Sequence, residues 1–206
     1  MKPTAAVCAA TMALLPAFGW AADSYAQAQA SFIFNGARIT IAPGNPQAGM
    51  YAARFAALPP VCEPACLSTG PAAKDVETVD EAAVLAFLVE VVGQNDGLMV
   101  DARMPQGRAA GFIPGSVSLP HETVAADNRY RDEILKALGV RVFEDLYNFS
   151  DAQALVVFDA GPTQNDAQKL IGNLLAAGYP PQKIRYYRGG MQVWSVLGLT
   201  IQEDMS

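Results

Sequence analysis

Apolar residues follow two different spacings along the chain, and the two alternate through its C-terminal two thirds. Residues 155–158 form an unbroken apolar run, which is typical of a strand that helices cover on both faces. Directly after it, Leu170, Ile171 and Leu174 recur at helical spacing. Similar strand and helix patterns occupy residues 98–103, 127–139, 183–187 and 190–198. This alternation predicts an α/β domain whose central, mainly parallel sheet is flanked by helices.

The region before this domain has a different pattern. Residues 30–42 contain two β-rich runs on either side of Asn35-Gly36, the dipeptide that a type I′ turn favours. They predict a β-hairpin, which must pack on the main domain or on a partner because an isolated hairpin is marginally stable. Residues 43–61 are rich in proline and glycine and predict a surface connector with a short helix at 51–58. The spacing of Thr78 and Glu81 predicts a capping box at the start of the next helix.

The first residues predict export. Lys2 precedes an uncharged apolar segment that is too short to span a bilayer comfortably, and small residues follow it. We interpret residues 1–28 as a signal peptide, cleaved after Ala28 or alternatively after Ala21; the competing interpretation is an uncleaved N-terminal anchor. Cys8 would leave with this peptide. The expected location is the periplasm or another exported compartment, with no membrane association after cleavage.

Composition restricts the partners. The chain carries 14 basic and 20 acidic residues, a formal net charge of −6. An acidic surface argues against nucleic acid or an anionic membrane as partner. We expect an unknown periplasmic protein or small ligand as the partner, and we predict no cofactor.

Two cysteines remain after the predicted cleavage, Cys62 and Cys66. Three interpretations stay open for this pair. An even number of cysteines in an oxidising compartment favours a structural disulfide. A short spacing also suits a redox-active dithiol. The third interpretation is a soft metal such as Cu(I), with His121 and methionines as further ligands.

Two ordered motifs resemble the rhodanese domain. The stretch LMVDARMPQGRAAGFIPGSVSLP is similar to that family's first motif, and AAGYPPQKIRYYRGGMQVWSVLGLTI is similar to its second. The amino-acid sequence of the second motif most resembles that of exported, single-domain bacterial rhodanese-like proteins. The matching positions are Asp101, Arg103, Gly111, Ile113, Pro114, Gly115, Gly189, Gly190 and Trp194. The resemblance implies a three-layer rhodanese-like domain over residues 74–202, after an N-terminal extension at 29–73 and before a tail at 203–206.

One residue departs from the chemistry that the resemblance implies. A rhodanese carries sulfane sulfur on a cysteine at the end of the central strand, inside a loop whose backbone amides stabilise the thiolate. Asp159 occupies that position, and a carboxylate cannot carry a sulfane sulfur. The loop that follows contains no Lys or Arg; its members are Ala160, Gly161, Pro162, Thr163, Gln164 and Asn165. We therefore expect neither thiosulfate sulfurtransferase activity nor the cysteine-dependent phosphatase activity of the related fold.

Asp159 has two possible roles. It caps the loop by accepting amide hydrogen bonds, in which case we expect the amides to keep it strongly ionised. Alternatively it acts as a nucleophile or metal ligand, although His121, the only histidine, belongs to a different crossover. Asp166 is a weak partner because acidic residues are common at helix starts.

The sequence therefore predicts a non-enzymatic binding module on an inactive rhodanese-like domain. A thiol-redox or sulfur-relay enzyme acting through Cys62 and Cys66 is the alternative, and soft-metal binding by the same cysteines is a weaker one.

Overall fold

The computed structural model describes residues 27–62, 66–144 and 146–203. The predicted signal peptide up to residue 26, with Cys8, and the predicted tail beyond Glu203 lie outside these ranges. No helix within them is both long enough and apolar enough to cross a membrane.

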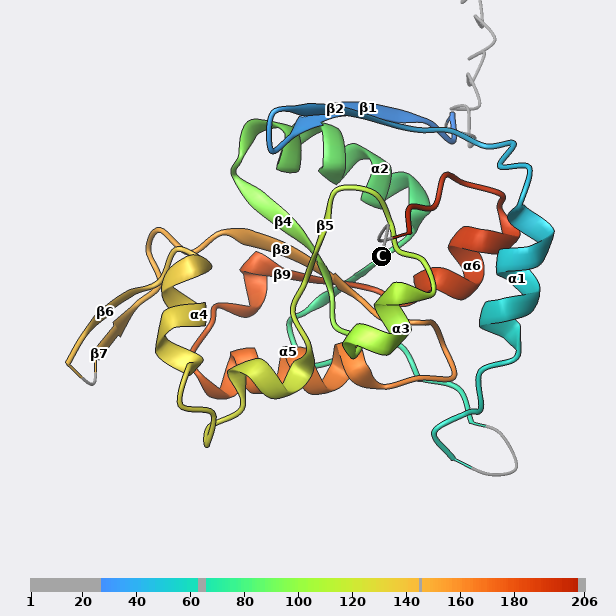
Figure 1. Cartoon of the computed structure of the whole chain (residues 1–206). Helices are drawn as coiled ribbons and strands as arrows, with labels where there is room; N and C mark the ends of the chain where they lie inside the picture. Colours follow the sequence, from blue (N-terminus) through green and yellow to red (C-terminus); the bar gives the residue numbers. More distant parts are fainter. Residues whose placement is uncertain (1–26, 63–65, 145, 204–206) are drawn as a thin grey trace, which may run out of the picture.

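Nine strands and six α-helices are assigned in these ranges (Figure 1). The strands are β1 (Ala30–Phe34), β2 (Ala37–Ile41), β3 (Glu77–Val79), β4 (Gly97–Asp101), β5 (Ser116–Ser118), β6 (Arg141–Phe143), β7 (Leu146–Asn148), β8 (Ala154–Phe158) and β9 (Ile184–Tyr187). The helices are α1 (Ala48–Ala56), α2 (Glu81–Glu90), α3 (Pro105–Ala109), α4 (Arg131–Ala137), α5 (Asp166–Ala176) and α6 (Gly190–Val196).

The centre of the domain is a five-stranded sheet in the order β3-β9-β8-β4-β5, and every neighbouring pair is parallel. Successive residues of β8 alternate between two hydrophobic cores. Leu155 and Val157 pack with α4 and α5, whereas Val156 and Phe158 pack with α1, α2 and α6. Because both faces are buried, the strand is apolar throughout, which explains the run in the sequence. The predicted α/β architecture is confirmed.

The predicted N-terminal hairpin is also confirmed. β1 and β2 pair antiparallel around Asn35 and Gly36, whose φ angles are +48° and +78°. Phe32 and Ile41 are buried in the core that contains α2, so the hairpin is anchored on the domain. Figure 1 shows it lying across α2 at the edge of the molecule.

One local prediction was wrong. Thr78 does not cap a helix, because it lies in β3 and pairs with Tyr186 of β9. The N-cap of α2 is Asp80, whose side chain accepts a hydrogen bond from the Ala83 amide at 2.9 Å. The chain before β8 also contains the short β6-β7 hairpin, for which no prediction was made because its exposed Phe143 and Leu146 gave no alternating pattern to detect.

Candidate functional site

The loop at residues 159–165 joins the carboxyl end of β8 to the N-terminus of α5. This is where open α/β sheets usually place ligands and chemistry. The start of α6 lies against the same loop, since the amides of Met191 and Gln192 donate to the carbonyls of Asp159 and Ala160 at 3.1 and 2.9 Å. Gly190 permits this contact because a Cβ there would lie 2.5 Å from the Asp159 carbonyl oxygen.

Asp159 uses both of its carboxylate oxygens to hold the loop. Oδ1 accepts a hydrogen bond from the Gly161 amide at 2.9 Å, and Oδ2 accepts one from the Ala167 amide at 3.0 Å. Ala167 lies in the first turn of α5, whose N-cap residue Asn165 makes no side-chain capping bond. Asp159, which is fully buried, therefore performs the capping that Asn165 does not.

The expectation that the loop amides keep Asp159 strongly ionised does not hold, because burial outweighs their effect on its pKa. Burial raises its pKa from 3.8 to about 6, and the two amide hydrogen bonds and more distant Arg103 offset only part of that increase. Asp166 raises it further through its own negative charge. The carboxylate is therefore mostly ionised at neutral pH but accepts a proton in mildly acidic solution.

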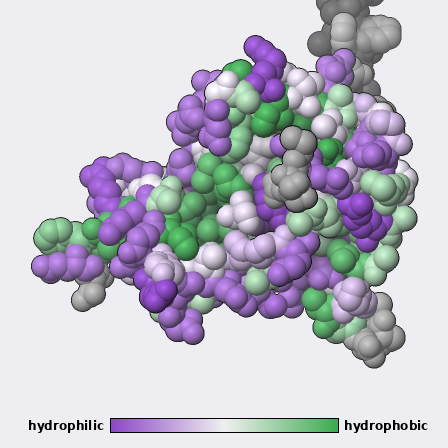
Figure 2. Space-filling view, in the orientation of Figure 1, coloured by the Kyte–Doolittle hydropathy of each residue, from purple (hydrophilic) through white to green (hydrophobic). Residues whose placement is uncertain are grey.

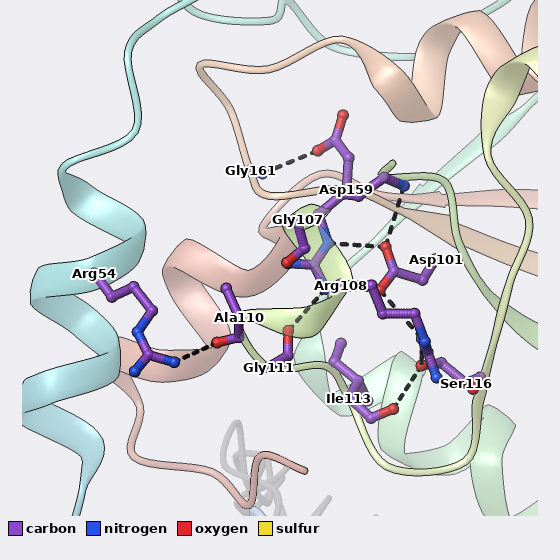
Figure 3. Close-up of polar contacts among 11 residues, drawn as sticks. Arg54, Asp101, Gly107, Arg108, Ala110, Gly111, Ile113, Ser116, Asp159 and Gly161 are labelled. Atoms are coloured by element: carbon purple, nitrogen blue, oxygen red, sulfur yellow. Dashed lines mark hydrogen bonds and ion pairs between the residues drawn. The ribbon is translucent and has the colours of Figure 1, made fainter. Parts of the chain in front are cut away.

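A second buried aspartate lies at the end of the neighbouring strand. Asp101 accepts hydrogen bonds from Arg103 at 2.8 and 2.6 Å and from Arg108 at 3.2 Å (Figure 3). Arg103 also donates to the carbonyls of Gly107 and Gly111, so its guanidinium fixes the start of the motif around Ile113 and Pro114. These motif residues stabilise the end of β4 and the segment that follows it, beside the loop of Asp159.

The N-terminal extension covers the loop through a segment that we call the covering segment, residues 58–62 and 66–68. The Val61 amide donates to the Thr163 carbonyl at 3.1 Å, and the Ser68 amide donates to the Pro162 carbonyl at 2.7 Å. Gln164 Nε2 donates back to the Pro59 carbonyl at 2.8 Å. Figure 2 shows hydrophobic surface at the lower right of the view, where this segment lies. The sequence placed the extension on the surface and left open whether its cysteines lie over the loop.

The cysteine pair belongs to the covering segment. The sulfur atoms of Cys62 and Cys66 lie at bonding distance, with their Cα atoms 5.7 Å apart, a separation compatible with a disulfide. Cys66 lines a cavity of about 340 Å³ together with Pro162, Gln164 and Asn165. The pair therefore lies beside the loop of Asp159.

Another cavity, of about 330 Å³, opens on the other side of Gln164 and is called the α1-α3 cavity below. Its walls come from α1, α3 and the loop; its lining includes Arg54, Phe55, Leu58, Arg103, Met104, Ala110, Ala160, Gln164 and Asp166. A larger cavity of about 600 Å³ lies under the β1-β2 hairpin, and none of its lining residues comes from the loop.

His121 lies closer to the loop than its place in the sequence suggested. Its Nε2 is 3.7 Å from Asp166 Oδ1, and Asn173 of α5 donates to its backbone carbonyl at 2.8 Å. The crossover that contains His121 and the crossover that contains Asp166 meet here. No local sequence pattern indicates this contact. Within the described ranges, no group of three or more His, Cys, Asp or Glu side chains is placed to hold a metal ion.

Comparison with known proteins gives the following matches. Residues 87–197, more than half of the chain, match the profile of the family described as Rhodanese-like domain. No curated protein sequence matches the chain. A Bacillus halodurans protein of solved structure shares 17% identity with a TM-score of 0.47, covering 62% of this chain and 77% of that one.

Two further solved structures are similar to the chain. A Rhodopseudomonas palustris protein of unknown function, described as a possible tyrosine phosphatase, shares 21% identity with a TM-score of 0.44, covering 64% of this chain and 88% of that one. Thiosulfate sulfurtransferase from Pseudomonas aeruginosa shares 18% identity with a TM-score of 0.43, covering 80% of this chain and 24% of that one.

Proposed function

The chain belongs to the rhodanese-like domain family, and we propose that it is an exported member that binds a partner protein or small ligand without transferring sulfur. In this proposal residues 1–28 are a signal peptide and residues 29–73 an extension that completes the binding site of the domain at 74–202. The protein acts in the periplasm or another exported compartment.

The hydrogen bonding of Asp159 supports the loss of sulfur transfer. The amides of Gly161 and Ala167 converge on the position where a rhodanese carries its thiolate, and the Asp159 carboxylate accepts both. The loop is therefore already occupied by an anion that belongs to the chain. A second anion such as thiosulfate would meet the charges of Asp159 and Asp166 with no Lys or Arg from residues 160–165 to attract it.

The two cavities beside the loop support a binding role. Each has a volume suited to a small ligand or to one side chain of a partner. Exposed apolar side chains surround them, and these are Leu58, Val61, Leu67 and Met104. Such a border is common at sites where another molecule docks.

The position of Cys66 favours one alternative function. Because Cys66 lines the cavity beside the loop, a thiol or sulfur donor that entered this cavity would reach the cysteine pair. The protein would then be a thiol-redox or sulfur-relay enzyme that uses Cys62 and Cys66 in place of a cysteine at position 159.

Intact mass spectrometry separates the two functions. The full chain is expressed for export, purified from the periplasm, reduced, incubated with thiosulfate or polysulfide, and weighed. We expect no added sulfur on the reduced protein. Sulfur on Cys62 or Cys66 that disappears in Cys62→Ser and Cys66→Ser variants would contradict the binding proposal and support the relay.

The matched positive control is Asp159→Cys in a chain that also carries Cys62→Ser and Cys66→Ser. The Gly161 and Ala167 amides would stabilise the new thiolate, so this variant should gain one sulfur atom from polysulfide. A variant that folds but gains none would mean that the loop itself, and not only Asp159, prevents sulfur transfer.

A further inference from the structure

Three charged side chains line the α1-α3 cavity, and two of them already have close carboxylate partners. Arg103, 3% exposed, lies 2.6 Å from Asp101. Arg54 lies 2.7 Å from Glu203 and also donates to the Ala110 carbonyl. The arginines therefore add little net positive charge to the cavity.

Asp166 is the third charged residue and differs from the arginines. Its nearest basic side chains are His121, with Nε2 at 3.7 Å, and Lys169, with Nζ at 3.9 Å, and both approach Oδ1. Within the described ranges no group donates a hydrogen bond to this carboxylate, although its side chain is only 25% exposed. A half-buried carboxylate without a close donor retains the capacity to bind one.

The remaining walls are mainly apolar. Phe55 and Leu58 come from the extension, Met104 and Ala110 flank α3, and Ala160 follows Asp159 in the loop. These side chains suit an aliphatic stem. They include no second carboxylate, so Asp166 is the one negatively charged side chain among the residues that line the cavity.

The loop amides do not favour an anion at this position, because Asp159 already accepts the hydrogen bonds of Gly161 and Ala167. A compact cation fits better than a guanidinium, which prefers both oxygens of a carboxylate. Oδ1 of Asp166 faces His121 and Lys169, which leaves Oδ2 for a single donor.

We propose that the α1-α3 cavity binds a protonated primary amine on an aliphatic stem, with the ammonium group on Asp166 and the stem against Phe55, Leu58 and Met104. This chemistry occurs both in free alkylamines and in the lysine side chain of a partner protein. The inference rests on the proposed function, since it requires that Asp159 occupies the loop amides.

The test measures binding of hexylamine, hexanol and hexanoate to the full chain at neutral pH by calorimetry and by amide chemical shifts. Hexylamine should bind more tightly than hexanol, and hexanoate should not bind. In Asp166→Asn the preference of amine over alcohol should fall by about fivefold while hexanol binding is unchanged. The matched control is Asp132→Asn, which removes a first-turn aspartate from α4 and should preserve the preference.

A lysine-containing peptide and its norleucine counterpart distinguish the two sources of the amine. Preferential binding of the lysine peptide assigns the cavity to a partner side chain, and binding of hexylamine alone assigns it to a small amine. Equal binding of amine and alcohol, or an amine preference that survives Asp166→Asn, would overturn the inference. These results are independent of the mass measurement, because sulfur uptake at Cys62 or Cys66 does not involve Asp166.

Discussion

Two buried aspartates at the ends of adjacent strands are held in different ways. Asp101 ends β4 and Asp159 follows β8, and both are fully buried. Asp101 is paired with the guanidinium groups of Arg103 and Arg108, whereas the hydrogen bonds that Asp159 accepts within the described residues come from backbone amides. Figure 3 shows the bond from one of these amides, that of Gly161. One carboxylate is therefore compensated by charge and the other by peptide dipoles.

The comparison separates a carboxylate paired with arginines from one that holds a loop through backbone amides. The Asp101 network connects the strand end to α3 and to the loop before β5, so it holds the motif in place. Asp159 occupies a loop built to stabilise an anion, and burial raises its pKa to about 6. A carboxylate that remains ionised there at neutral pH lowers the stability of the fold.

The largest effect is expected from Asp101→Asn. This change leaves Arg103 buried without its carboxylate, and we expect the free energy of unfolding to fall by about 3–5 kcal/mol. Urea denaturation at neutral pH measures the loss. Glu203→Gln is the matched control, because it breaks the exposed pair with Arg54 and should cost less than about 1 kcal/mol. Equal losses in the two variants would contradict the claim that the buried Asp101 network stabilises the fold more than the exposed Arg54–Glu203 pair does.

A smaller, pH-dependent effect is expected from Asp159→Asn. The pKa of Asp159 is about 6 in the folded protein against 3.8 in the unfolded chain, so the folded state binds this proton more tightly. Its contribution to stability therefore falls as pH rises from about 4 to about 6, by about 3 kcal/mol in total. The asparagine does not titrate, so wild type should gain about this amount over the variant when the pH is lowered from 7 to 4.

Denaturation of both proteins at a series of pH values measures this difference. The exposed Asp127→Asn serves as control, since it removes a carboxylate that is not buried. A difference between wild type and Asp159→Asn that stays constant from pH 4 to pH 7 would contradict the assignment of a raised pKa.

The sequence predicted the main strand, the N-terminal hairpin and the motif around Asp101 well because local patterns determine them. The apolar run at 155–158, the Asn35-Gly36 turn and the motif residues around Asp101 all lie where the patterns indicated. The prediction of a capping box at Thr78 was wrong because pairing with β9, a strand distant in the sequence, overrides the capping signal. Such pairing is a property of the fold and not of the local sequence.

The site was only partly predictable for the same reason. The position of Asp159 follows from the strand end, but its raised pKa depends on the burial that many distant residues create. The contacts of Val61 and Ser68 with the loop are backbone hydrogen bonds, which side-chain patterns do not encode. The approach of His121 to Asp166 requires that two crossovers meet, which only the assembled sheet determines.

The most direct test of the account is a titration of the Asp159 side-chain carboxyl carbon by NMR in selectively labelled protein. Its assignment is checked by loss of the signal in Asp159→Asn. The account predicts a midpoint at about pH 6, because the effect of burial on the carboxylate exceeds that of the hydrogen bonds from the Gly161 and Ala167 amides. A midpoint at or below 3.8 would contradict it and would mean that the loop is open to solvent or carries a compensating positive charge.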